Sequence, residues 1–284
     1  MRIDNTVTVK DGTTIFYRDT HPTDYEGLTV IALAGLTRNS LDFDYLLSHF
    51  DPELRMVRID SRGRGYSAYA DPASYTVEQE SADVLEVMDH LGIERAAFIG
   101  TSRGGLIATY LATVAPERIV GVCFNDIGPV IEDTGLKDIS NYLGVPPIAK
   151  NMIEMAELIK AGRTANGFKN TPDSRWLEEA KNQYIQVGGK IDLMYDPGLR
   201  EVFIQNWVDE GVAPFWDEFD RLVAKPLAMV RGENSNILSV ETLEEMQKRR
   251  PDMLTCVIKD RGHVPFLDEP EALDTINAWI KSCQ

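Results

Sequence analysis

The chain has 284 residues, 43% of them hydrophobic, and carries 29 Lys and Arg against 45 Asp and Glu, a net charge of −16. The length is compatible with two domains or one large α/β domain, and the hydrophobic content is enough for a buried core, which argues against a disordered protein. The negative charge argues against a nucleic-acid-binding protein, because it would repel a phosphate backbone.

The cysteines and the N-terminal segment indicate where the protein works. Cys123, Cys256 and Cys283 lie far apart and form no CxxC pair, which argues against disulfides or zinc and is typical of a reducing cytoplasm. Residues 1–20 have no apolar core, and no stretch approaches the ~20 apolar residues of a membrane span. We therefore expect a cytoplasmic protein without a signal peptide or a membrane partner.

Strands and helices alternate in the first half of the chain. Two alternating runs flank Asp11-Gly12 and predict a hairpin. A capping box of Thr76 and Gln79 predicts the start of one helix, and a second helix is predicted over 104–115. Short apolar runs predict buried strands at 28–33, 56–59, 96–99 and 119–124. This alternation predicts a largely parallel sheet that is covered on both faces.

The pattern changes over residues 130–213. This region is rich in large aromatic residues and has no convincing buried strand. It shows helical patterns at 148–161, 175–185 and 199–208. Strands are predicted again at 227–230 and 254–258, with helices at 241–249 and 270–280. We therefore predict one α/β domain, residues 1–129 and 214–284, interrupted by a helical insert over 130–213.

A G-x-S-x-G pentapeptide at residues 100–104 separates a predicted strand from a predicted helix. In that context it is typical of a sharp turn that holds a nucleophilic serine, here Ser102, in strained backbone geometry. The N-terminus of the following helix favours negative charge that develops there. An ordinary glycine-rich turn is the alternative, but the strand before and the helix after favour a nucleophile.

A serine hydroxyl needs a base, and His263 is the best placed of the four histidines. It lies on a loop just after the last predicted strand. His49 and His90 lie in amphipathic helices, and His21 lies in a polar N-terminal loop. We therefore predict His263 as the base.

These motifs resemble those of α/β-hydrolases that carry an inserted cap domain. The resemblance covers nearly the whole chain and depends on residues 34–38, 60–67, 100–105, 231–233 and 262–263. It implies the α/β-hydrolase fold, a mostly parallel eight-stranded sheet flanked by helices, with a helical cap inserted after the sixth strand. It also implies an oxyanion hole made by the backbone N–H groups of Leu36 and Arg103, and no metal or organic cofactor.

The acid of the triad remains open between three positions. Relatives with a similar Arg-Gly-Glu-x-Ser segment carry an Asp where this chain has Asn236, and an asparagine cannot carry the charge that stabilises an imidazolium. Certain haloalkane dehalogenases, which the chain also resembles, take the acid from an earlier strand end, here Asp126. Asp126 is our first choice, although it could instead anchor the start of the cap. Asn236 as a neutral orienter, or as an inactivating change, and Glu233 are the alternatives.

Other patterns predict no further cofactor. Residues 63–68 fit G-x-G-x-x-[G/A], but a loop that contains Pro72 follows them where a dinucleotide site needs a helix. No HExxH or EF-hand spacing accompanies the 45 carboxylates, so we predict no metal site.

Four side chains are candidates for the substrate pocket. Trp207 and Trp216 lie in or next to the aromatic-rich insert, and some aromatics of a cap should line the site beneath it. Arg38 and Arg103 lie beside the oxyanion loop and the nucleophile. Each could hold a substrate carboxylate or carbonyl, but pairing with an acidic residue is slightly favoured.

The sequence predicts a serine hydrolase, monomer or homodimer, that cleaves a small carboxylic ester or lactone through an acyl-enzyme. A carbon–carbon bond hydrolase of a ring-cleavage product, with the same triad, is one alternative. A ligand-binding protein on a decayed hydrolase scaffold, which Asn236 would support, is another. The serine at position 102 argues against dehalogenase or epoxide hydrolase chemistry, because relatives with those activities carry an aspartate there.

Overall fold

An eight-stranded sheet forms the centre of the computed structural model, which describes residues 3–21, 25–209 and 211–284. The strand order is β1-β2-β4-β3-β5-β6-β9-β10. The strands are β1 (Ile3–Thr8), β2 (Thr14–Asp19), β3 (Thr29–Leu33), β4 (Arg55–Ile59), β5 (Ala96–Thr101), β6 (Ile119–Asn125), β9 (Leu227–Gly232) and β10 (Leu254–Ile258). Among the described strand pairs of this sheet, β1–β2 and β2–β4 are antiparallel and the other five are parallel, so the predicted mostly parallel sheet is confirmed.

The central strands are buried on both faces, as their continuous apolar runs predict. Every residue of β3 and β5 is buried. Because side chains alternate along a strand, Ile31 and Leu33 pack into one core and Val30 and Ala32 into the other.

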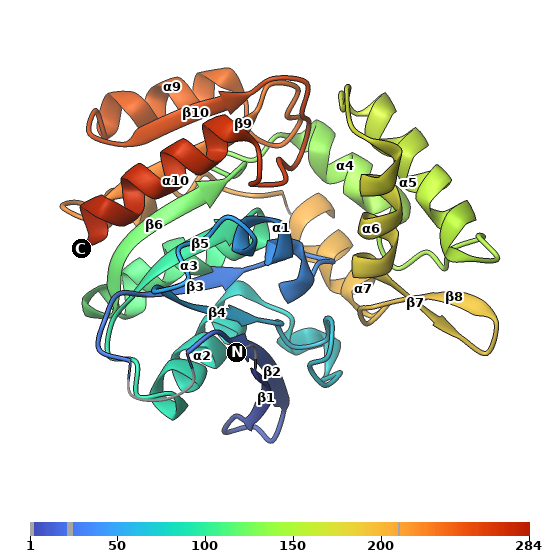
Figure 1. Cartoon of the computed structure of the whole chain (residues 1–284), viewed down its shortest axis with the longest axis horizontal. Coiled ribbons are helices and arrows are strands. Elements are labelled where there is room, and N and C mark those ends of the chain that lie inside the picture. The colour runs from blue at the N-terminus through green and yellow to red at the C-terminus, as the bar shows by residue number, and fades with distance from the viewer. Residues whose placement is uncertain (1–2, 22–24, 210) are drawn as a thin grey trace.

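Helices cover both faces of the sheet (Figure 1). One core includes residues of α2 (Val77–His90), α3 (Arg103–Val114) and α9 (Val240–Arg249). The opposite core includes residues of α1 (Asp44–Leu47) and α10 (Pro270–Cys283). This is the layered arrangement that the alternation of strands and helices predicts.

The chain leaves the sheet between β6 and β9. Figure 1 shows the elements of this insert grouped on one side of the molecule. They are α4 (Asp133–Tyr142), α5 (Met152–Ala165), α6 (Asp173–Gln183), the hairpin β7 (Tyr184–Val187) and β8 (Lys190–Leu193), α7 (Leu199–Phe203) and a π-helical segment Ile204–Asp209. The short α8 (Trp216–Asp220) leads back to the sheet. The predicted limits of the cap at 130 and 213 stay a prediction.

The insert contains elements that its sequence pattern did not predict. Helix α4 and the β7–β8 hairpin were not predicted, and the helix expected over 175–185 ends at Gln183, where β7 begins. Within the described part of the chain, no helix is long and apolar enough to cross a bilayer.

Candidate functional site

Ser102 lies at a tight turn between β5 and α3, with φ of 49° and ψ of −113°. A positive φ is costly for a residue with a side chain and is found where the surroundings impose it. The flanking glycines allow the chain to pack closely enough to form this turn. A Cβ on Gly100 would lie 2.5 Å from the backbone nitrogen of Gly105, and one on Gly104 would lie 2.0 Å from the Leu33 carbonyl oxygen. The turn therefore closes only with glycine at both positions.

The structure brings Ser102, His263 and Asp126 together. The Nε2 atom of His263, on the loop after β10, lies 3.0 Å from Ser102 Oγ. The Nδ1 atom of the same ring lies 2.8 Å from Oδ2 of Asp126, which follows β6 and is fully buried. A hydroxyl, an imidazole and a carboxylate in this order form a path along which the imidazole can accept the hydroxyl proton.

Two donors, one at the end of β9 and one on the loop after it, hold the Asp126 carboxylate. The backbone N–H of Gly232 donates to Oδ1 at 2.8 Å, and the Ser235 hydroxyl donates to Oδ2 at 2.6 Å. Hydrogen bonds of this kind stabilise an ionised carboxylate and fix its orientation toward the ring. Sequence reasoning missed both residues, although they lie in the Arg-Gly-Glu-x-Ser segment that suggested an acid on this loop.

The two alternative acid positions lie elsewhere. Asn236 is partly exposed, and its Nδ2 donates to the carboxylate of Asp138 on α4 at 2.7 Å. Glu233 is exposed and accepts from the backbone N–H of Asp260 at 3.1 Å. Among the contacts of the described residues, neither side chain touches His263.

The two predicted oxyanion donors lie beside Ser102. Arg103 is the first residue of α3, so its N–H has no acceptor within the helix. Leu36 follows Gly35, where a Cβ would lie only 3.7 Å from the Cβ of Ser102. The side chain of Arg64 donates to the Leu36 carbonyl at 3.0 Å and so fixes this loop.

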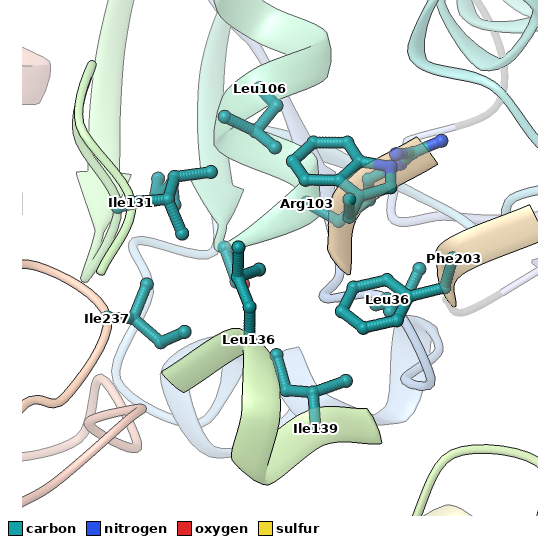
Figure 2. Close-up of a pocket in the computed structure, with 11 residues that line it drawn as sticks. Leu36, Arg103, Leu106, Ile131, Leu136, Ile139, Phe203 and Ile237 are labelled. Carbon is teal, nitrogen blue, oxygen red and sulfur yellow. The ribbon is translucent and has the colours of Figure 1, made fainter. Parts of the chain in front are cut away.

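A narrow apolar cavity adjoins Ser102 (Figure 2). Its volume is about 30 Å³, which is too small for an ester, so a substrate must displace some of the lining side chains. The lining comes from the loop after β3, from the turn at Ser102 and α3, from the segment after β6, from the insert and from the loop after β9. It consists of Leu36, Ser102, Arg103, Leu106, Ile127, Ile131, Leu136, Ile139, Phe203, Trp207 and Ile237.

Of the two predicted pocket tryptophans, the structure brings only Trp207 into this cavity. Trp216 lies outside it, because α8 directs the ring against Phe219 at 6.1 Å between ring centroids. The guanidinium of Arg249 covers the Trp216 ring at 4.4 Å. Trp216 is thus a packing residue in this structure.

Arg38 and Arg103, the two predicted pocket arginines, both form ion pairs with carboxylates. Pairing with an acidic residue is the role that the sequence slightly favours over substrate binding. Arg38 lies outside the cavity, with Nε 2.5 Å from Asp42 and Nη2 2.8 Å from Glu179 on α6. Burial raises the pKa of the Asp42 carboxyl to about 6, while the charge of Arg38 opposes that rise. Arg103 donates from Nε to Glu80 at 2.9 Å.

The three cysteine side chains do not form part of the site. Burial raises the pKa of the Cys123 and Cys256 thiols and raises that of Cys283 to about 12. Thiols in such surroundings stay protonated and are poor nucleophiles.

Comparison with known proteins agrees with this fold. A family model described as the alpha/beta hydrolase fold matches residues 29–270. The chain is 31% identical over 248 residues to a 3-hydroxybutyrate-oligomer hydrolase of Cupriavidus necator, covering 85% of this chain and 84% of the relative. It is 23% identical over 245 residues to a 2-(acetamidomethylene)succinate hydrolase of Mesorhizobium japonicum, covering 86% and 84%.

A solved structure is similar over nearly the full length. The crystal structure of an alpha/beta hydrolase from Novosphingobium aromaticivorans matches with a TM-score of 0.92 and 32% identity, over 99% of this chain and 98% of that one. The eight-stranded sheet, the family match and these relatives lead to one assignment. The chain belongs to the α/β-hydrolase fold family of hydrolases.

Proposed function

We propose that this hydrolase cleaves small carboxylic esters or lactones with a catalytic triad of Ser102, His263 and Asp126. The observation that carries the proposal is the pair of contacts made by one imidazole, 3.0 Å to the hydroxyl of Ser102 and 2.8 Å to the buried carboxylate of Asp126. Residues 130–213 act as the cap, since α4, α7 and the π-helical segment contribute side chains to the cavity beside Ser102.

The proposed reaction has two steps. His263 takes the proton of Ser102, whose oxygen attacks the ester carbonyl, while the N–H groups of Leu36 and Arg103 hold the oxyanion. Asp126 keeps the proton of the ring on Nδ1 and stabilises the imidazolium. His263 then protonates the leaving alcohol, and the same residue activates the water that hydrolyses the acyl-enzyme.

Short hydroxy-acid esters are the substrates that we favour. The 31% identical relative is named a 3-hydroxybutyrate-oligomer hydrolase, and the apolar lining beside Ser102 suits a short aliphatic acyl group.

A fluorophosphonate probe tests the nucleophile directly. We expect it to label the wild-type chain and not Ser102→Ala, and we expect the wild type to hydrolyse short p-nitrophenyl esters and the linear dimer of 3-hydroxybutyrate. A folded wild type that takes no label would contradict the proposal and favour a binding protein. Cleavage of a chromogenic dienoate with no ester hydrolysis would favour a carbon–carbon bond hydrolase instead.

A further inference from the structure

Arg163 on α5 lies beside the proposed base, and no carboxylate within the described residues lies within ion-pair distance of it. Its Nη1 donates to the backbone carbonyl of His263, and its guanidinium lies 5.4 Å from the ring centroid of Phe168. Its other N–H groups make no hydrogen bond within the described part of the chain. Arg38 and Arg103, by contrast, each have carboxylate partners.

Arg163 also lines a cavity of about 290 Å³ between the insert and the loop after β3. The polar groups around it are those of Thr37, Asn166, Gln183 and three tyrosines, Tyr142, Tyr184 and Tyr195. No carboxylate is among the described lining residues, although the chain has 45 acidic residues. A cavity that combines a guanidinium with hydroxyl and amide groups is suited to an anionic ligand.

The loop after β3 contributes a residue to each of the two cavities. Leu36, a proposed oxyanion donor, lines the cavity beside Ser102, and the next residue, Thr37, lines the cavity of Arg163. Arg163 contacts the backbone carbonyl of His263, and the ring of the same histidine contacts the Ser102 hydroxyl. A small molecule with an apolar part and an anionic end could therefore occupy both cavities with its ester carbonyl at Ser102.

Asp42 and Glu179 lie near Arg163 and line a smaller cavity with it, but both carboxylates are paired with Arg38. Desolvation and the neighbouring charge of Arg38 lower the pKa of Arg163, while Glu179 and Asp42, the partners of Arg38, attract it from beyond contact distance. A carboxylate bound to the guanidinium fork would supply the missing contact partner in a strong, oriented ion pair.

We propose that Arg163 determines specificity by binding a carboxylate of the ester substrate. The substrate class is then an ester of a hydroxy acid that has a free carboxylate, as the linear oligomers of hydroxy acids have. This inference rests on the proposed ester hydrolysis and adds to it which esters are preferred.

Two substrates that differ only in the carboxylate test the proposal: the linear dimer of 3-hydroxybutyrate and its methyl ester. We expect the wild type to prefer the free acid. In Arg163→Met, kcat/KM for the acid should fall about 10- to 100-fold, mainly through KM, while the methyl ester changes less than about threefold. Arg163→Lys should recover part of the loss. Lys181→Met, which removes an exposed charge from α6, is the matched control and should keep the preference.

Equal losses on both substrates in Arg163→Met, through kcat, would overturn the proposal and leave Arg163 as a positioning residue for His263. A wild type with no preference for the acid would also overturn it. Calorimetric binding of 3-hydroxybutyrate to Ser102→Ala separates this inference from the proposed hydrolysis, since binding does not need turnover. Binding that Arg163→Met does not weaken in that background would contradict the carboxylate site, whether or not the wild type hydrolyses esters.

Discussion

The Asp126 carboxylate depends on residues far along the chain. Its donors Gly232 and Ser235 lie 106 and 109 residues later, at the end of β9 and on the loop after it, in the segment where the resemblance suggested an acid. In this chain that segment supplies hydrogen-bond donors, and the carboxylate comes from the end of β6. A neutral residue at Asn236 is then compatible with an intact triad, because Asn236 contacts Asp138 and not the histidine.

Alanine substitutions at Asp126 and Asn236 test which of the two residues is the acid of the proposed triad. We expect Asp126→Ala to lower kcat on a p-nitrophenyl ester by about 10⁴, because the imidazole loses the group that fixes its tautomer and stabilises its charge. Asn236→Ala should leave kcat within about threefold of wild type. The side-chain amide of Asn236 is partly exposed, and its hydrogen bond is to Asp138, not to the His263 ring. Near-normal turnover by a folded Asp126→Ala would remove Asp126 from the triad.

Ser102 and His263 could be predicted because each has a local signal, a glycine-bounded turn between strand and helix and a histidine just after the last strand. The acid could not be fixed in the same way. The contact between His263 and Asp126 joins residues 137 positions apart, and no local pattern encodes it. The position of Trp216 outside the cavity could not be predicted for a similar reason, because the direction of its ring depends on how α8 packs.

The turn of the β1–β2 hairpin is tied to a later loop by one aspartate. Asp11 accepts from the backbone N–H of Thr13 at 2.9 Å and from Arg62 Nη1 at 2.8 Å. The backbone hydrogen bond of Thr13, followed by the contacts with Arg62, lowers the pKa of Asp11 from 3.8 to about 2 against a desolvation that raises it.

A lowered pKa in the folded state means that the ionised carboxylate stabilises the fold. This stabilisation is complete above pH 3.8 and is lost as the pH falls through about 2. We expect Asp11→Asn to reduce the free energy of unfolding at pH 7 by less than about 1 kcal/mol, because the side chain is 43% exposed and solvent screens the pair. Urea unfolding from pH 7 to pH 3 should show the difference narrowing below pH 4. A difference that stays constant over this range would exclude the carboxylate as its cause.

Helix α2 has a buried carboxylate that two arginines share. Glu80 lies 2.8 Å from Arg64 Nη1 and 2.9 Å from Arg103 Nε, and all three side chains are buried. Glu80→Gln would leave both guanidinium groups without a compensating charge, so we expect it to lower the free energy of unfolding by about 3–5 kcal/mol. Glu78→Gln, on the exposed face of the same helix, should change it by less than about 0.5 kcal/mol. Thermal unfolding of both variants is the measurement, and equal effects would contradict this account.

At the scale of elements, the core strands were predictable because burial on both faces leaves a continuous apolar run, as in β3 and β5. The β7–β8 hairpin lacks this signal, since β7 is largely exposed. Its turn, Gly188-Gly189, has positive φ values of 57° and 79°, and a Gly-Gly pair is a recognised hairpin signal that could have indicated it. Helix α4 buries only Gly135 and Leu136, too few residues for a clear period.

Across the whole molecule, the insert holds the loop that carries His263. Arg163 donates to the carbonyl of His263, and Arg175 on α6 pairs with Asp268. The Lys169 carbonyl accepts from Arg261, at the start of that loop, at 3.0 Å. The position of the insert after the sixth strand was predictable from the resemblance. Its docking was not, because it consists of contacts between residues about 90 to 100 positions apart.

The Arg175–Asp268 ion pair can be used to measure how strongly the insert is bound to the loop that carries His263. The two side chains are 17% and 19% exposed, and the guanidinium also lies 4.6 Å from the ring centroid of Phe266. In a double-mutant cycle of Arg175→Met and Asp268→Asn, we expect a coupling of about 1–3 kcal/mol in the free energy of unfolding. Both single variants should also lower kcat, since the loop of His263 loses an anchor while Ser102 and Asp126 are unchanged.

The pair Lys160–Asp173 provides the matched control. It links α5 to α6 within the insert and is 38% and 80% exposed, so we expect no measurable coupling and no change in kcat. Equal couplings for the two pairs would mean that Arg175 does not dock the insert. A full coupling for Arg175–Asp268 with unchanged kcat would separate the two roles. This contact would then stabilise the fold without holding His263 in place, and the position of that ring would depend on its contact with Asp126.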